Sequence, residues 1–192
     1  KTVAQAGGTI IVAFDVAMRA PEHDDQLIFT MDTVFGFFPK EALATQAGLV
    51  PVAGEREWVF GRDASDELID LTERPARFCE GSARLAQPML LMLDRLTGAW
   101  PEAGAAGLGR YRAEKAVDPG EWFFKAHFYQ DPVQPGSLGI EALLQLVQAA
   151  ALHRGLHLNM RAPRFEAVAV AQPLKWSYRG QVMPHNKVIT SS

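Results

Sequence analysis

A histidine, a glutamate and a glycine–serine pair occur close together in one stretch of this sequence: His127, Gly136, Ser137 and Glu141. A histidine side chain can take up a proton as a general base, and a carboxyl group that keeps its proton can act as a general acid. The first N–H groups of a helix favour developing negative charge. Together these groups predict removal of a proton next to a thioester carbonyl group, with stabilisation of the resulting oxyanion.

A helix over residues 137–154 must position most of these groups. Ser137 suits the N-cap and Gly155 suits the end of the helix. The segment between them is apolar on nearly all sides, which predicts a helix inside the protein, wrapped by a sheet.

Three polar residues interrupt this apolar helix with the spacing i, i+4 and i+7, and therefore share one face: Glu141, Gln145 and Gln148. A charged carboxylate is costly to bury, which favours a chemical role for Glu141. The alternative is a polar stripe that faces solvent or a subunit interface. His127 likewise has a plain alternative, a histidine packed in the core beside Phe128.

The segment HFYQDPVQPGSLGIEALLQL (127–146) resembles the signature of hot-dog-fold 3-hydroxyacyl-acyl carrier protein (ACP) dehydratases, in particular the β-hydroxydecanoyl-ACP dehydratase/isomerase family. FGFFPKEALATQAGL (35–49), PMLLMLDRLTGAWPEAGAAGLG (88–109) and WSYRGQVMPHNKVIT (176–190) extend the resemblance to the tandem dehydratase region of a polyunsaturated-fatty-acid synthase or a related polyketide-type megasynthase.

The resemblance implies a role for each residue of the motif. His127 would be the catalytic base and Glu141 the acid, while the N–H groups of Gly136 and Ser137 would bind the thioester oxygen. Gln145 would orient the acid. The decanoyl-specific branch usually carries aspartate in place of Glu141, so the resemblance implies dehydration without establishing isomerisation. Two residues would shape the loop, Asp131 and Pro132.

The reaction implied is dehydration of a 3-hydroxyacyl chain to a trans-2-enoyl chain, carried on the phosphopantetheine of an ACP, with neither a metal nor a redox cofactor. In such dimers, or in tandem hot-dog pairs, the active site lies across the interface. Two same-fold alternatives are a thioesterase and an enoyl hydratase. A non-catalytic dehydratase-like scaffold that binds carrier or neighbouring domains is the alternative from another class.

Composition limits the broader possibilities. The chain has 192 residues, of which 48% are hydrophobic and 21% charged, so it can build a core. A net charge of -3 argues against a nucleic-acid partner. The single cysteine, Cys79, excludes an internal disulfide and is expected to be inert. No apolar run reaches the roughly 20 residues of a membrane span, and Lys1 begins a segment without a signal-peptide core, so a cytoplasmic protein is expected.

The pattern of elements predicts an α+β fold, a curved antiparallel sheet around helix 137–154. Strands are expected at 8–18, 26–35, 108–117, 165–176 and 178–189, a helix at 35–49, and a strand or buried helix at 89–100. The resemblance implies that residues 1–50 are the C-terminal strands and helix of a first hot-dog unit. Residues 51–87 are expected to form a linker with one short helix, and 88–192 a second unit, incomplete at its C-terminus. A partial double hot dog and a circularly permuted single one, with residues 8–35 in the second sheet, both fit.

Three further sets of residues have chemical potential but more ordinary explanations. His23, Asp24 and Asp25 are metal-type side chains in a polar loop, where three adjacent residues rarely converge on one ion. His153 and His157 have zinc-type spacing, but Gly155 separates them, which favours a solvated helix end. The last set could bind an acidic carrier or the phosphopantetheine phosphate, although scattered surface charge is expected instead: Arg110, Arg112, Lys115 and Arg154.

Overall fold

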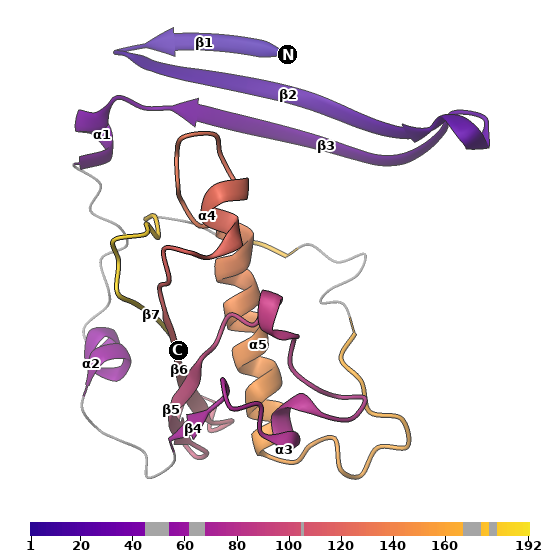
Figure 1. The fold of residues 1–192 in the computed structure, drawn as a ribbon, viewed down its shortest axis with the longest axis vertical. Coiled ribbons are helices and arrows are strands. Elements are labelled where there is room, and N and C mark those ends of the chain that lie inside the picture. Colours follow the sequence, from indigo (N-terminus) through magenta and orange to yellow (C-terminus); the bar gives the residue numbers. More distant parts are fainter. Residues whose placement is uncertain (45–53, 62–67, 105, 167–173, 177–179) are drawn as a thin grey trace. The chain divides into compact units, whose positions relative to one another are not determined.

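A computed structural model describes residues 1–44, 54–61, 68–104, 106–166, 174–176 and 180–192 (Figure 1). The chain divides into two compact units, Lys1–Gly48 and Leu49–Ser192. Each unit has its own antiparallel sheet. No helix in the described ranges is long and apolar enough to cross a membrane.

The first unit is a three-stranded sheet of β1 (Thr2–Ala6), β2 (Thr9–Ala20) and β3 (Gln26–Phe37), in that order. Gly7 and Gly8 join β1 to β2 with φ of 55° and 80°, a left-handed pair that suits a two-residue hairpin. A 3-10 turn, η1 (Pro21–His23), joins β2 to β3, and a short helix, α1 (Lys40–Ala44), follows. The two predicted strands are confirmed, whereas β1 is not predicted by the sequence pattern.

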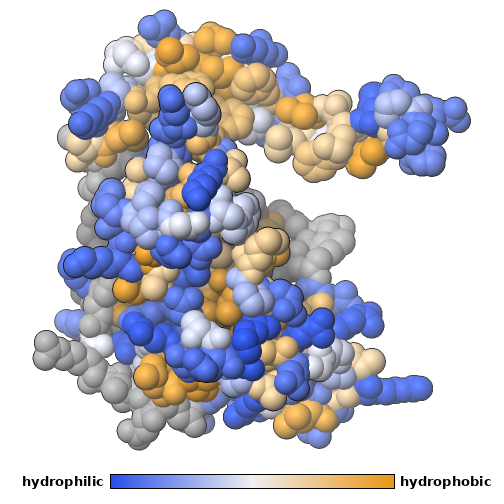
Figure 2. All heavy atoms as spheres, viewed as in Figure 1, coloured by the Kyte–Doolittle hydropathy of each residue, from blue (hydrophilic) through white to orange (hydrophobic). Residues whose placement is uncertain are grey.

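Alternation along β2 and β3 places large apolar residues on one face of this sheet. The pairs Val12↔Phe35, Val16↔Met31 and Met18↔Phe29 lie on that face, because successive residues of a strand point to opposite sides. Figure 2 shows apolar residues at the surface of these strands. The opposite face carries small and polar residues, including a carboxylate pair, Asp15↔Asp32. The first unit therefore leaves much of its apolar surface uncovered by its own residues.

The second unit has a four-stranded antiparallel sheet, in the order β4 (Ile69–Asp70), β5 (Arg95–Trp100), β6 (Arg110–Ala116) and β7 (Val188–Ser191). Its helical segments are α2 (Glu55–Phe60), α3 (Ala76–Cys79), the 3-10 turn η2 (Pro88–Leu90), α4 (Trp122–Ala126) and α5 (Gly136–His153). Strand pairing within the described residues joins β4–β7 only to one another and β1–β3 only to one another. The pairing required by the permuted alternative is thus not found.

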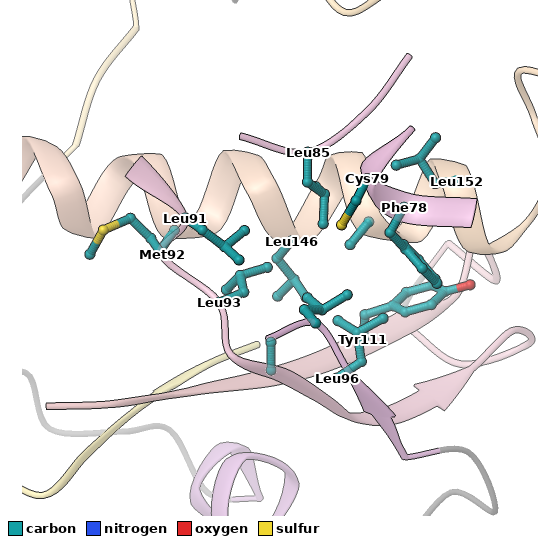
Figure 3. Packing of buried hydrophobic residues seen from close by; sticks show 14 of the residues in the cluster. Phe78, Cys79, Leu85, Leu91, Met92, Leu93, Leu96, Tyr111, Leu146 and Leu152 are labelled. Carbon is teal, nitrogen blue, oxygen red and sulfur yellow. The ribbon is translucent and has the colours of Figure 1, made fainter. Parts of the chain in front are cut away.

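The core of the second unit lies between one face of α5 and the sheet (Figure 3). The buried positions of α5 recur with helical spacing, so a single stripe of the helix packs inward. This stripe consists of Leu138, Ala142, Gln145, Leu146, Ala149 and Leu152. The other side leaves Leu143 and Val147 exposed. The prediction of a helix apolar on nearly all sides therefore corresponds here to one packed face and one apolar face that this unit leaves uncovered.

Two predictions about local structure need correction. Residues 69–87 are not a simple linker, because Leu71, Phe78 and Leu85 are buried members of the core cluster. Ser137 is not the N-cap of α5: the helix begins at Gly136, Pro135 occupies the cap, and Ser137 is exposed. Gly155 ends the helix as predicted, with φ of 67°.

The remaining predictions about elements met mixed outcomes. The run 89–100 divides into η2 and strand β5, and the predicted strand at 108–117 is found as β6. The predicted helix at 35–49 appears as α1, and its residues beyond 44 lie outside the described ranges. Of the predicted strand at 178–189, the described residues contribute the start of β7. Residues 167–173, in the other predicted tail strand, also lie outside the described ranges.

Candidate active site

His127 lies directly after α4, on a loop that leads to α5. Its backbone N–H donates to the Phe123 carbonyl at 3.0 Å, and its ring stacks on Phe128 with centroids 3.9 Å apart. The side chain is partly exposed. His127 is therefore held at the edge of the core and is not one of its buried members.

The hydrogen bond of the imidazole ring defines which nitrogen can act as a base. Nδ1 of His127 lies 2.9 Å from the Val133 carbonyl oxygen. A carbonyl oxygen can only accept, so Nδ1 carries the proton in this bond. In neutral His127 the lone pair is then on Nε2, the nitrogen that can take up a proton from a substrate.

The loop between His127 and α5 is folded by its own backbone. Val133 N–H donates to the Asp131 carbonyl at 2.9 Å, and Gln134 N–H donates to the Val182 carbonyl at 2.9 Å. Asp131 and Pro132 are exposed, whereas Val133 and Gln134 are buried. This geometry is compatible with the loop-shaping role expected for Asp131 and Pro132, and it presents the Val133 carbonyl to His127.

The N-terminus of α5 offers unpaired backbone donors. Gly136 is the first helical residue and Ser137 the second, and the first N–H groups of a helix have no partner within it. Neither N–H has a hydrogen-bond partner among the described residues. The two groups can therefore donate to a carbonyl oxygen, and the helix dipole favours negative charge there.

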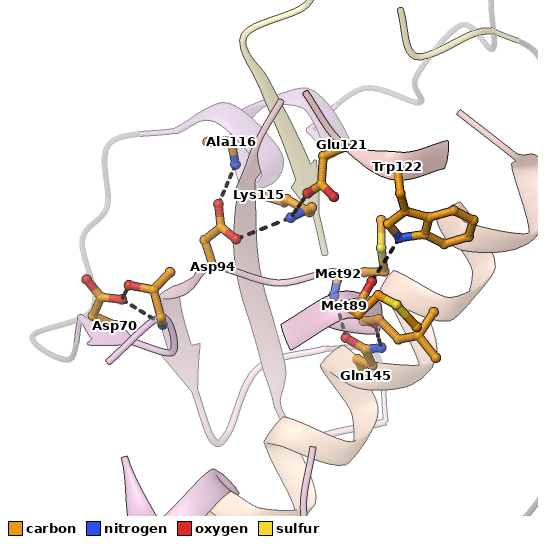
Figure 4. Close-up of polar contacts among 11 residues, drawn as sticks. Asp70, Met89, Met92, Asp94, Lys115, Ala116, Glu121, Trp122 and Gln145 are labelled. Carbon is orange, nitrogen blue, oxygen red and sulfur yellow. Dashed lines mark hydrogen bonds and ion pairs between the residues drawn. The ribbon is translucent and has the colours of Figure 1, made fainter. Parts of the chain in front are cut away.

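Glu141 and Gln145 are brought together on α5, as their spacing predicts. The Gln145 Nε2 amide donates to Glu141 Oε1 at 2.8 Å. Gln145 is fully buried, at 0% exposure, and its amide also binds two backbone groups: Nε2 donates to the Leu90 carbonyl at 2.8 Å, and Oε1 accepts from Met92 N–H at 2.7 Å (Figure 4). Its side-chain geometry is thus fixed by neighbours at both ends of the amide.

His127 and Glu141 make no hydrogen bond to each other in the described structure. Each is held by a separate set of contacts, the first by the loop and the second by Gln145. Gln148, the third polar residue of the helical stripe, is partly buried. The site within one chain is therefore a base next to helix N–H donors, and an acid a turn further along α5.

The basic residues considered for carrier binding are mostly engaged within the fold. Arg112 is buried, donates to the Gly61 and Thr97 carbonyls, and lies over the Trp100 ring at 5.4 Å. Lys115 is also buried and pairs with Asp94 and Glu121. Neither residue is the exposed surface charge expected from the sequence.

The other two basic residues lie at an open pocket of about 360 Å³ beside the C-terminal half of α5. Arg110 donates to the Ser192 hydroxyl, and Arg154 donates to the Leu108 carbonyl. None of the residues expected in catalysis lines this pocket.

The residues weighed as metal ligands do not assemble into a site. In the described part of the chain, no three His, Cys, Asp or Glu side chains lie where they could hold one metal ion. His153 Nδ1 is 3.1 Å from the Tyr111 hydroxyl. Cys79 is buried, and this burial raises the pKa of its thiol, which lowers its reactivity at neutral pH.

Three features of the site have no counterpart in the motif analysis: the Val133 carbonyl, the Met89 carbonyl and Trp122. Trp122 Nε1 donates to the Met89 carbonyl at 3.0 Å. The aromatic run before His127 is the one signal in the sequence for Trp122, and it does not identify a partner. Backbone carbonyls leave no trace in residue types.

Comparison with known proteins agrees with this architecture. The FabA-like domain matches residues 85–191. The chain therefore belongs to the FabA-like family of hot-dog dehydratases, and its sheet and long helix α5 fit that α+β fold.

The chain is also 32% identical, over 178 residues, to a polyunsaturated fatty acid synthase polypeptide of Thraustochytrium sp.. The match covers 88% of this chain but 12% of that protein. The chain thus resembles one part of a much longer fatty acid synthase polypeptide.

Proposed function

We propose that this chain dehydrates (3R)-hydroxyacyl chains, bound as thioesters to an ACP, to trans-2-enoyl chains in fatty-acid or polyunsaturated-fatty-acid synthesis. The observation that carries the proposal is the bond from His127 Nδ1 to the Val133 carbonyl, 2.9 Å long. It leaves Nε2 as the basic nitrogen, on a loop that leads directly into the N-terminus of α5.

In the proposed reaction Nε2 of His127 removes a proton from C2 of the substrate. The electron pair of the broken C–H bond forms the C2=C3 double bond as the C3–O bond breaks. Glu141 gives its proton to the departing hydroxyl group, which leaves as water. The N–H groups of Gly136 and Ser137 stabilise the negative charge that develops on the thioester oxygen.

Gln145 is proposed to hold the acid in place. Its Nε2 donates to Oε1 of Glu141, and burial of the amide restricts the rotation of both side chains. No metal or redox cofactor enters this mechanism, because each step is a proton transfer or a bond cleavage that these side chains can serve.

Since His127 and Glu141 do not contact each other within the described chain, we propose that each completes a site with residues of a second hot-dog unit. That unit belongs either to a second copy or to a tandem domain. Assignment of residues 1–50 to a first hot-dog unit, the ACP partner and a cytoplasmic location remain predictions from the sequence.

The test is turnover of a 3-hydroxyacyl thioester, and of the 2-enoyl thioester in the reverse direction. We expect His127→Ala and Glu141→Gln each to lower the rate by about 10²- to 10⁴-fold, the usual contribution of a general acid or base. His23→Ala, which alters an exposed histidine in the first unit, is the matched control and should leave the rate unchanged. Turnover that survives His127→Ala, or a folded wild type without turnover, would contradict the proposal and favour a scaffold.

A further inference from the structure

One short segment, Met89–Met92, is bound from two sides by elements that carry proposed catalytic groups. The Trp122 indole N–H donates to the Met89 carbonyl at 3.0 Å. The Gln145 amide binds the next carbonyl, of Leu90, and the N–H of Met92. Figure 4 shows Trp122 and Gln145 on either side of this segment.

Trp122 opens the short helix that ends at the base. Helix α4 has five residues, and His127 caps its C-terminus through a bond from its N–H to the Phe123 carbonyl. A helix this short has little stability of its own, so outside contacts must fix its direction. Phe123 and Phe124 supply buried apolar contacts, and Glu121 pairs with Lys115 at 3.0 Å.

The indole bond differs from these contacts because it is directional and joins α4 to the segment that Gln145 holds. An indole N–H can only donate, so its position specifies the Met89 carbonyl as partner. Gln145 is part of α5, the helix whose first residues carry the proposed oxyanion donors. The path Trp122–Met89–Leu90–Gln145 therefore connects the base-bearing helix to the oxyanion-bearing helix through hydrogen bonds and a short backbone.

We propose that Trp122 is a positioning residue for His127: its indole N–H sets the base at the correct place relative to the N-terminus of α5. This inference rests on the proposed dehydratase function. It predicts that loss of the N–H lowers the rate of the chemical step and not the binding of substrate, because Trp122 acts through the placement of His127.

The variant Trp122→Phe keeps an aromatic ring and removes the N–H. We expect kcat to fall about tenfold, with KM within about twofold, because small displacements of a reacting group carry costs of this order or more. Trp176→Phe is the matched control: this tryptophan is exposed and makes no hydrogen bond to a described residue. It should leave kcat unchanged.

A double-variant comparison separates positioning from general damage. In a His127→Gln background, Trp122→Phe should cause no further fall in the residual rate, because the group it positions is gone. The same tenfold fall in both backgrounds would overturn the proposal, as would an unchanged kcat in the single variant.

Nuclear magnetic resonance of the His127 imidazole gives a readout that does not depend on turnover. The Nδ1–H signal should shift and exchange faster with solvent in Trp122→Phe, and stay unchanged in Trp176→Phe. An unchanged His127 signal in Trp122→Phe would overturn the positioning role, even if the dehydratase function holds. A wild type without turnover would instead refute the dehydratase function, while the imidazole signal would still decide whether Trp122 positions His127.

Discussion

The two units of this chain use apolar residues in opposite ways. In Leu49–Ser192 the large apolar side chains of α5, α3 and the sheet bury one another, and several leucines are almost fully covered. In Lys1–Gly48 the strands are as apolar in sequence, yet Leu27, Phe29 and Phe37 stay exposed by about half. A sheet needs a second layer to bury its face, and only the second unit supplies one of its own.

This difference indicates where the stability of the chain is generated. It also offers a probe specific to one unit, because every tryptophan of the sequence lies after residue 48. Tryptophan fluorescence therefore reports the unfolding of the second unit alone.

The largest expected effect is the loss of a core leucine in the second unit. Leu152→Ala removes a side chain with 0% exposure and should lower the free energy of unfolding by about 2–5 kcal/mol. Leu27→Ala makes the same chemical change at a residue 48% exposed in the first unit, where about 0.5 kcal/mol or less is expected. Denaturant titrations followed by tryptophan fluorescence measure both. Equal losses would mean that the two units unfold as one.

A second large effect should come from the buried amide of α5. Gln145→Leu keeps the size of the side chain but leaves the Leu90 carbonyl and the Met92 N–H without their partner. Each buried group left unpaired costs about 1–3 kcal/mol, which the same titration would detect. Gln148→Leu on the same helix, where the amide has no described partner, should be close to neutral. A neutral Gln145→Leu would show that water replaces the amide.

A smaller and opposite effect is expected in the first unit. Asp15 and Asp32 are paired directly across β2 and β3, and like charges in such pairs repel. Asp32→Asn should stabilise the sheet by about 0.2–1 kcal/mol, measured as slower amide exchange in β2 and β3. Asp32→Glu keeps the charge and should give no gain. The benefit of Asp32→Asn should shrink in high salt, and a benefit independent of salt would exclude repulsion as its cause.

The smallest expected effect concerns the end of β4. The Thr72 hydroxyl donates to Asp70 at 2.6 Å and the Thr72 N–H donates at 2.8 Å, and these bonds lower the pKa of the Asp70 carboxyl. Because the folded pKa lies below the unfolded one, the stabilisation is present above the unfolded pKa and is lost as pH falls through the folded pKa.

Thr72→Val should raise the Asp70 pKa toward its ordinary value, observed by carboxyl carbon titration. Thr72→Ser retains the hydroxyl and should keep the lower pKa. A pKa unchanged in Thr72→Val would show that the backbone N–H alone is responsible.

The sequence predicts those features of the fold that depend on local pattern. Helix α5 is an example: its apolar period and Gly155 define its length to within one residue. The predicted cap is wrong, because the proline before Gly136 already has the backbone angles that allow the helix to start there. The Glu141–Gln145 contact is predictable, since residues four apart share a helix face.

Features that depend on distant partners are not predictable in this way. Arg112 and Lys115 look like surface charges until Gly61, Asp94 and Glu121 are brought beside them. Leu71, Phe78 and Leu85 are spread through a segment rich in charge and proline, where short elements give no clear period. Their burial is decided by contacts with α5 and the sheet.

Strand β7 has a consequence for the order in which the second unit folds. Its residues pair with β6 at Ala113↔Ser191 and Ala116↔Val188, far apart in sequence, whereas β5 and β6 are near neighbours that form an antiparallel pair. Closing a long loop costs more chain entropy than closing a short one, and contacts of long sequence separation slow folding. The β5–β6 hairpin therefore forms first, and the last strand docks onto it as the rate-limiting event.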